Sequence, residues 1–149
     1  AVLCDFVRGT GLGFRARCVN DTVMGGRSES SLTVTERGLL FEGNVTRNGG
    51  GGFCSIRLDA AEPGELARAL AGSSGLSFVV RRAQGCRAWK LQLHEAYDAL
   101  QWQADFVAAE GSEPQTLPLA SFVPMRRGRP QGRPGLGEED LQRVYSLGF

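Results

Sequence analysis

Val19-Asn20-Asp21-Thr22-Val23-Met24-Gly25-Gly26-Arg27-Ser28 and Gly51-Gly52-Phe53-Cys54-Ser55-Ile56-Arg57 are the two stretches that decide the fold of this chain. The first combines residue types that form a tight turn. Gly25 and Gly26 tolerate a positive φ, and Asn20 and Asp21 can bond to nearby backbone amides. We expect Met24 to fill a gap in the core. This interpretation makes the stretch a structural turn.

A ligand-binding loop is the alternative interpretation of the same residues, because Asp21, Arg27 and Ser28 can together hold a polar group. Both interpretations stay open at the level of sequence. The residues to which we assign a structural or binding role are Asn20, Asp21, Met24, Gly25, Gly26, Arg27, Ser28, Gly52, Phe53, Ser55 and Arg57.

The glycine run before the second stretch, Asn48–Gly52, resembles a loop that cradles phosphate with backbone N–H groups. However, no Lys-Ser/Thr pair follows it and no helix begins there, so we favour a flexible hairpin connection. Arg57 ends the second stretch. We expect its side chain to point outward and to pair with Asp21 or Glu42.

Length and composition indicate one small domain rich in turns. The chain has 149 residues, 42% of them hydrophobic, and a formal net charge of +1. A near-zero charge gives no overall attraction to nucleic acid or to an anionic membrane. The 21 glycines are about twice the usual share of ~7%, which favours many turns over long helices. No stretch reaches the ~20 apolar residues of a membrane span.

Apolar and polar residues alternate along much of the chain, which is typical of strands with one face in a core. One helix is expected at Pro63–Ala71 and a further helical turn at Glu138–Arg143. The pattern predicts an all-β sandwich or barrel. The expected strands are Leu32–Thr35, Leu39–Val45, Gly52–Leu58, Leu76–Arg81, Trp89–His94, Leu100–Phe106, Gln115–Leu119 and Val144–Phe149.

The two stretches together closely resemble the complex I intermediate-associated protein family, whose hallmarks are N-D-x-V-M-G-G-x-S and G-G-F-x-S-[IV]-R. Trp89-Lys90-Leu91, Ser121-Phe122-Val123-Pro124 and the closing Ser146-Leu147-Gly148-Phe149 also fit. The resemblance spans about Asp5 to Phe149. It implies a single domain over residues 1–149 with a galactose-binding-like jelly-roll β-sandwich and one or two short helices.

Family domains usually continue into a further strand, so we expect this domain to lack its last strand. We further expect that Val144–Phe149 then lies at an open sheet edge, which a partner subunit or a tail covers.

The resemblance also implies a function. It indicates a non-catalytic protein-binding module, an assembly factor or accessory subunit of a large membrane electron-transfer complex, either respiratory complex I or a photosystem. The implied partners are protein subunits of that complex, with a possible membrane-surface contact and no cofactor. The implied location is organellar, at the thylakoid of a plastid or the mitochondrial inner membrane, without spanning it. Nothing else in the residues separates the two complexes.

Catalytic and metal sites find no support in the sequence. His94 is the only histidine, and no nucleophile or oxyanion hole can be assigned beside it. The four cysteines, Cys4, Cys18, Cys54 and Cys86, contain no C-x-x-C pair. A zinc site is therefore not expected, and free thiols are favoured over disulfides, whose pairing the sequence leaves open.

A polar sheet face is a second candidate binding surface. If Ala88–Glu95 pairs with Leu100–Phe106, six polar residues form one contiguous patch that can bind sugar or protein. A carbohydrate-binding module is thus an alternative function, and a plain solvated face is the simplest interpretation. The six residues are Lys90, Gln92, His94, Gln101, Gln103 and Asp105.

A basic loop over Arg126–Gly137 is a third candidate surface. Its arginines suit carboxylates of a protein partner or lipid phosphates. Because no stacking aromatic residues interleave with them, RNA binding by a plastid biogenesis factor is the less favoured alternative. The candidate contact residues are Arg126, Arg127, Arg129 and Arg133.

Overall fold

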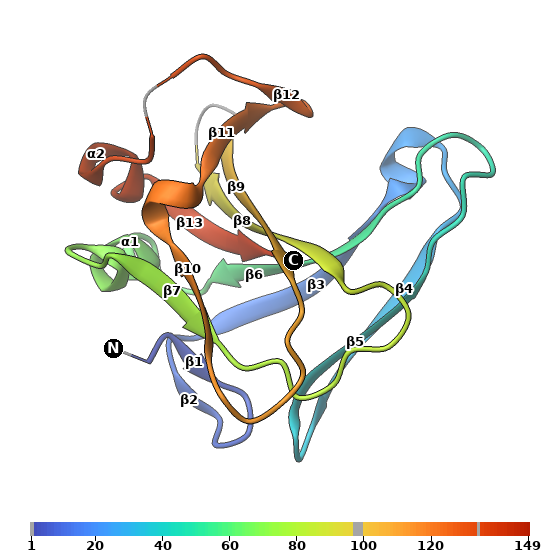
Figure 1. Ribbon diagram of the computed structural model, residues 1–149, viewed down its shortest axis with the longest axis horizontal. Coiled ribbons are helices and arrows are strands. Elements are labelled where there is room, and N and C mark those ends of the chain that lie inside the picture. Colours follow the sequence, from blue (N-terminus) through green and yellow to red (C-terminus); the bar gives the residue numbers. More distant parts are fainter. Residues whose placement is uncertain (1, 97–99, 134) are drawn as a thin grey trace.

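The computed structural model describes residues 2–96, 100–133 and 135–149 of the chain. Antiparallel strands dominate it, and two short α-helices and two 3₁₀ turns accompany them within these residues (Figure 1). The chain is therefore an all-β sandwich with short helices, and the predicted fold class is confirmed.

One seven-stranded antiparallel sheet forms the body of the molecule, with the strand order β12-β11-β9-β8-β13-β6-β3. In that order the strands are Arg129–Pro130, Val123–Arg126, Leu100–Val107, Ala88–Glu95, Val144–Gly148, Cys54–Ala60 and Phe14–Asn20.

Smaller elements surround this sheet. The β4–β5 hairpin projects away from the rest of the chain in Figure 1. The two-stranded pairs are β1 with β2 (Cys4–Asp5, Thr10–Gly11), β4 with β5 (Glu29–Thr35, Gly38–Asn44) and β7 with β10 (Gly75–Phe78, Gln115–Pro118). The helical elements are η1 (Asp21–Met24), α1 (Glu65–Leu70), η2 (Leu119–Ser121) and α2 (Glu138–Leu141).

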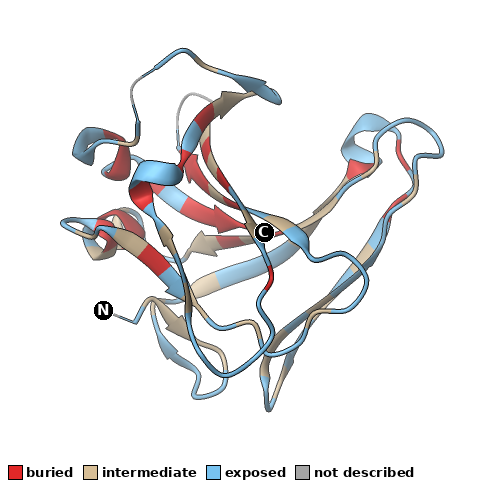
Figure 2. Cartoon of the chain, viewed as in Figure 1, coloured by how far each residue is buried: buried red, intermediate tan, exposed pale blue. Residues whose placement is uncertain are grey.

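The hydrophobic core lies against one face of the large sheet, where buried residues gather in Figure 2. Helix α1 covers this face because Leu66 and Leu70, four residues apart, both point into the core. Each fully buried leucine contributes about 1.5–3 kcal/mol of transfer free energy. The sheet residues buried in the core are Leu58, Leu91, Leu93, Leu100, Trp102, Ala104, Val144 and Leu147.

The opposite face of the large sheet is polar, because neighbouring residues of a strand point to opposite sides. In the register of β8 and β9, Lys90 lies opposite Asp105, Gln92 opposite Gln103, and His94 opposite Gln101. The pairing that was expected for the polar patch is therefore present. The same face continues onto β13 and β6, where Ser146 lies between His94 and Asp59.

Most expected elements are found close to their predicted bounds. Strands occur at all eight expected places, although β7 ends at Phe78, and the two expected helical segments are α1 and α2. Strand β3 was not predicted, although Phe14, Ala16 and Cys18 alternate with Arg15 and Arg17. Part of the predicted Arg126–Gly137 loop is a short hairpin instead, since β11 pairs with β12; Pro134 lies outside the described residues.

The expected open edge at Val144–Phe149 is wrong. Strand β13 lies inside the sheet, with β6 on one side and β8 on the other. Phe149 is also held, because it exchanges two backbone hydrogen bonds with Ile56 at 2.9 and 3.1 Å. Its ring packs edge-on against Phe78 and Phe106. The end of the strand is thus fixed by its own sheet.

Candidate functional site

Asp21 is the centre of the turn that the first stretch forms. It is the first residue of η1, directly after β3, and its side chain is completely buried. One carboxylate oxygen accepts a hydrogen bond from the Ser28 backbone N–H at 2.9 Å. The other accepts from the Ser28 hydroxyl at 2.6 Å and from the backbone N–H groups of Gly52 at 2.7 Å and Phe53 at 3.3 Å. The two sequence stretches therefore meet on one carboxylate.

Hydrogen bonding keeps this buried acid ionised. The bond from the Ser28 hydroxyl lowers the pKa of Asp21 most, and the amide donors of Ser28, Gly52 and Phe53 lower it further against the opposing effect of burial. Four donors leave little acceptor capacity for a ligand. Asp21 therefore acts as a structural anchor, and the ligand-loop interpretation loses its central residue.

Glycines make room for the carboxylate. A Cβ on Gly51 would lie 2.6 Å from the Asp21 Cβ, and one on Gly26 would collide with the Asp21 carboxylate carbon. Gly25 has a φ of 84° and ends η1 in the left-handed region, as expected from the sequence. Only residues without a side chain fit against Asp21 here.

The glycine run is held in place rather than flexible. The Gly52 N–H donates to Asp21, and a Cβ on Gly49 would lie 2.5 Å from the Gly25 carbonyl oxygen. The run thus helps to cradle an anion, as the phosphate-loop interpretation required, but the anion is a side chain of the protein itself. The run is the connection between β5 and β6, as expected from the sequence.

Further hydrogen bonds join the turn to neighbouring strands. The Ser28 hydroxyl accepts from the Thr46 N–H at 3.0 Å, which connects the turn to the segment after β5. Asn20 accepts from the Ser30 hydroxyl at 2.6 Å. The Ser55 hydroxyl donates to the Val19 carbonyl at 2.9 Å. We call this assembly of the turn and its partners the Asp21 hub.

Val23, Met24 and Arg27 are among the residues of the turn that face solvent. Val23 is 74% exposed, Met24 is 67% exposed and Arg27 is also exposed. The expectation that Met24 fills a core gap is wrong, because η1 places it on the outer side of the hub. The hub therefore holds an apolar pair at the surface.

Arg57 does not form the expected pair with Asp21 or Glu42. Asp21 accepts from Ser28, Gly52 and Phe53, and among the described residues Arg57 has no ion pair. Its side chain instead lies half-buried on the polar face of the large sheet, opposite Gly148 of β13.

His94 is the only imidazole of the chain and lies on the polar face, 7% exposed. Burial, and then the positive charge of Arg57, lower its pKa to about 3. The ring is therefore neutral at physiological pH. Since an efficient general acid or base has a pKa near the working pH, His94 is poorly suited to that role. The patch around it offers hydrogen bonds: Lys90 pairs with Asp105 at 2.9 Å, and Gln92 approaches Gln103 at 3.5 Å.

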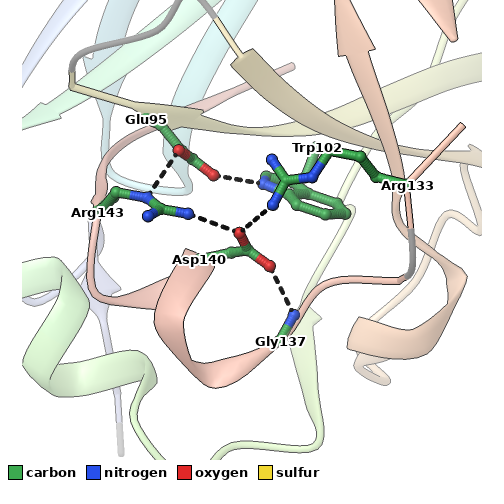
Figure 3. A network of polar contacts seen from close by, with 6 residues as sticks. All are labelled: Glu95, Trp102, Arg133, Gly137, Asp140 and Arg143. Carbon is green, nitrogen blue, oxygen red and sulfur yellow. Dashed lines mark hydrogen bonds and ion pairs between the residues drawn. The ribbon is translucent and has the colours of Figure 1, made fainter. Parts of the chain in front are cut away.

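The basic loop has partners within the chain. Arg133 donates to Asp140 at 3.1 Å, and its guanidinium lies 5.7 Å from the centre of the Trp102 ring (Figure 3). Arg126 is partly buried and also has interactions within the chain. Arg127, Arg129 and Arg133 are the exposed arginines of this set and remain candidate contacts.

Sequence reasoning missed the polar network behind this loop. The Trp102 indole N–H donates to Glu95 at 2.8 Å, and Arg143 joins Glu95 to Asp140 with bonds of 3.0 and 2.8 Å (Figure 3). Asp140 also accepts from the Gly137 N–H at the start of α2. The acidic first turn of α2 after a glycine was the one available signal. The network fastens the loop and α2 to the sheet.

Metal-binding and redox groups are few. Within residues 2–96, 100–133 and 135–149 there is no cluster of three or more His, Cys, Asp or Glu side chains that could hold a metal ion. The four cysteines are free thiols. No helix in the described part of the chain has both the length and the apolar character needed to cross a bilayer.

Comparison with known proteins agrees with the sequence motifs. A search of curated proteins found no match to this chain. Residues 6–149 match the family model described as complex I intermediate-associated protein 30, and this match covers the Asp21 hub and the whole large sheet. The description implies a role related to complex I assembly and association with complex I components. The chain therefore belongs to the complex I intermediate-associated protein 30 family.

Proposed function

We propose that this chain is a non-catalytic docking module that binds protein subunits of complex I assembly intermediates in the mitochondrion. The observation that carries the proposal is the family match over residues 6–149, almost the full chain. Membership of this family links the chain to complex I assembly, and the proposal adds how the domain takes part: by binding rather than by catalysis.

The geometry of the Asp21 hub supports a binding role. Its carboxylate is occupied by four donors from the protein, so the hub works as a rigid support. On its outer side it presents Val23, Met24 and Arg27. Methionine and arginine are enriched in protein interfaces, and a preorganised surface loses less entropy on binding. We propose Val23 and Met24 as the apolar contact.

Native electrophoresis of mitochondrial membranes tests this function. The wild-type chain is expected to migrate with complex I assembly intermediates. The double variant V23E/M24E places two charges in the proposed apolar contact and is expected to reduce the co-migrating fraction at least about tenfold. The matched control is V34E, because Val34 is also an exposed valine, 65% exposed, but lies on β4.

The outcomes separate the parts of the proposal. Migration of the wild-type chain only as a free monomer would contradict the docking function. Equal co-migration of V23E/M24E and V34E would place the contact elsewhere on the chain. Presence of the wild-type chain in mature complex I would identify an accessory subunit, whereas its restriction to intermediates would identify an assembly factor.

A further inference from the structure

Three arginines share one region of the polar face of the large sheet. Strands β3 and β6 pair so that Arg17 lies directly opposite Arg57, and Arg15 lies directly opposite Asp59. Directly opposed residues of antiparallel strands point to the same side, so all four side chains project from the polar face. We call Arg15, Arg17, Arg57 and Asp59 the arginine cluster.

The charges of the cluster are not balanced. Asp59 is its one acid, and it accepts from the Arg17 Nε at 2.8 Å. Three positive charges against one negative charge leave a local excess of +2. Like charges that face each other across two strands are destabilising, so Arg17 opposite Arg57 needs a compensating anion. Asp59 forms its ion pair with Arg17, and its charge favours the charged form of Arg57 without forming an ion pair with it.

Arg57 is the unbalanced member. It forms no ion pair among the described residues, and its Nε is buried without a hydrogen-bond partner. Burial, and then the charge of Arg17, lower the pKa of Arg57. Half-buried charges in proteins are usually paired. The guanidinium is therefore available to an acceptor that approaches the sheet.

A second unpartnered group lies beside Arg57. The His94 ring is more than nine-tenths buried, and its Nε2 has no hydrogen-bond partner. A Cβ on Gly148 would lie 3.1 Å from this nitrogen, 3.2 Å from the Gln92 Oε1 and 3.4 Å from the Arg57 Cδ. Side chains from β6 and β8 therefore fill the space over Gly148, which leaves little room there for even a Cβ. Because the His94 Nε2 is itself buried, the half-buried Arg57 is the member of this pair that a bound group can reach.

We propose that the arginine cluster is a docking surface for an acidic segment of a partner protein, with one carboxylate of that segment bound to the Arg57 guanidinium. The planar fork of arginine matches a carboxylate in a bidentate geometry. A bound carboxylate neutralises the charge that Asp59 leaves uncompensated. This inference rests on the proposed docking function, to which it adds the chemistry of the partner.

Charge density decides between a protein and a membrane as the occupant. Binding to anionic lipid by electrostatics alone generally takes clusters of 4–8 basic residues. The cluster has three, one of which is already paired with Asp59. The face is also mixed, since Asp105 and the glutamines of β8 and β9 lie on it. One or two carboxylates match this pattern better than a lipid surface.

The direct test is an NMR titration of the ¹⁵N-labelled chain with a hexaglutamate peptide, which follows the Arg57 Nε–H signal in the wild-type chain and the backbone amide signals of Gly148 and its neighbours in every variant. The wild-type chain is expected to show a saturable shift of this signal, which weakens with added salt. R57Q is expected to bind at least about tenfold more weakly, and R57K to lie between the two because it keeps the charge and loses the fork. The matched control is R37Q, an exposed arginine in the turn between β4 and β5, expected within about twofold of wild type.

Several results would overturn the inference. They are the absence of any shift in the wild-type chain, an equal loss of affinity in R57Q and R37Q, and full binding by R57Q that retains the wild-type amide spectrum. Binding of phosphatidylserine vesicles, oligouridine or a neutral oligosaccharide at Arg57 in place of the peptide would likewise assign the surface to another class of ligand.

The dependence on the proposed function is tested separately, by the native electrophoresis described above. If wild-type chain migrates with complex I intermediates and R57Q does so equally, the inference fails and the proposed function stands. If wild-type chain does not migrate with them although the peptide binds at Arg57, the docking function fails and the acidic-segment site stands. Loss of co-migration by R57Q, with R37Q unaffected, supports both.

Discussion

Asp21 holds together two sequence stretches that lie some 30 residues apart. Its oxygens accept from Ser28, seven residues away, and from Gly52, 31 residues away. A buried carboxylate is costly unless it is hydrogen-bonded, and here every donor comes from the protein. The hub therefore requires an acid at position 21 and glycine at the positions where a side chain would displace that acid.

Replacing Asp21 by Asn tests this role through pH. The folded-state pKa of Asp21 lies below its ordinary value, so its contribution to stability is complete above the unfolded-state pKa of about 4 and is lost as the pH falls through the folded-state value. We expect D21N to unfold several degrees below wild type at pH 7, and the difference to shrink below about pH 4.

Thermal unfolding of both proteins at pH 7, 5 and 3 measures this effect. The control is D105N, because Asp105 is an exposed partner of Lys90, and exposed ion pairs contribute little. Parallel pH profiles for D21N and wild type would show that the carboxylate charge does not stabilise the hub.

The hub residues also show what a sequence can reveal. Asn20, Asp21, Gly25 and Gly26 were predicted to form a tight turn, because their local preferences do not depend on distant contacts. The position of Met24 was predicted incorrectly. Whether an apolar residue of a 3₁₀ turn faces inward depends on the elements packed behind the turn, and these come from the 46–53 segment. Sequence alone does not place that segment beside η1.

At the scale of elements, the connection between β5 and β6 packs against η1, and its glycines differ in how much room each has for a side chain. Gly50 and Gly51 are adjacent and both have positive φ, 80° and 121°, but their surroundings differ. A Cβ on Gly50 would meet nothing within 4 Å, whereas one on Gly51 would lie 2.6 Å from the Asp21 Cβ. An alanine at Gly50 therefore tests backbone strain alone, whereas an alanine at Gly51 tests backbone strain and steric contact together.

We expect Gly50→Ala to cost about 1–2 kcal/mol, the usual penalty for a side chain in the left-handed region. Gly51→Ala is expected to cost about 1–3 kcal/mol more, because it also forces η1 and the connection apart. Urea denaturation of the two variants measures the difference. Equal losses of stability would mean that η1 and the connection are not in tight contact.

Strands were predicted correctly where apolar and polar residues alternate along the strand. β8 and β9 have a core on one side and solvent on the other, so their period of two is plain in the sequence. β3 was missed because it is an edge strand with exposed residues on both faces. The place of β13 was also mispredicted. Strand order depends on long-range pairing, which alternation within a strand does not encode.

At the scale of the whole molecule, the two faces of the large sheet have different roles. One face carries the core and gives the fold its stability. The other carries polar side chains, among them the arginine cluster, and β3 continues directly into the Asp21 hub. The polar patch around His94 was predicted from hairpin pairing. The arginine cluster was not, because it needs β3 and its register with β6.

Site-specific photo-crosslinking in mitochondria tests the docking function most directly. The variant Met24→p-benzoylphenylalanine places a photoreactive ring on the outer side of the hub, and the same residue at Val34 is the control. We predict that illumination links position 24 to a subunit or assembly partner of complex I and that position 34 gives no such product. A folded chain whose position 24 forms no link to any complex I component would contradict the account.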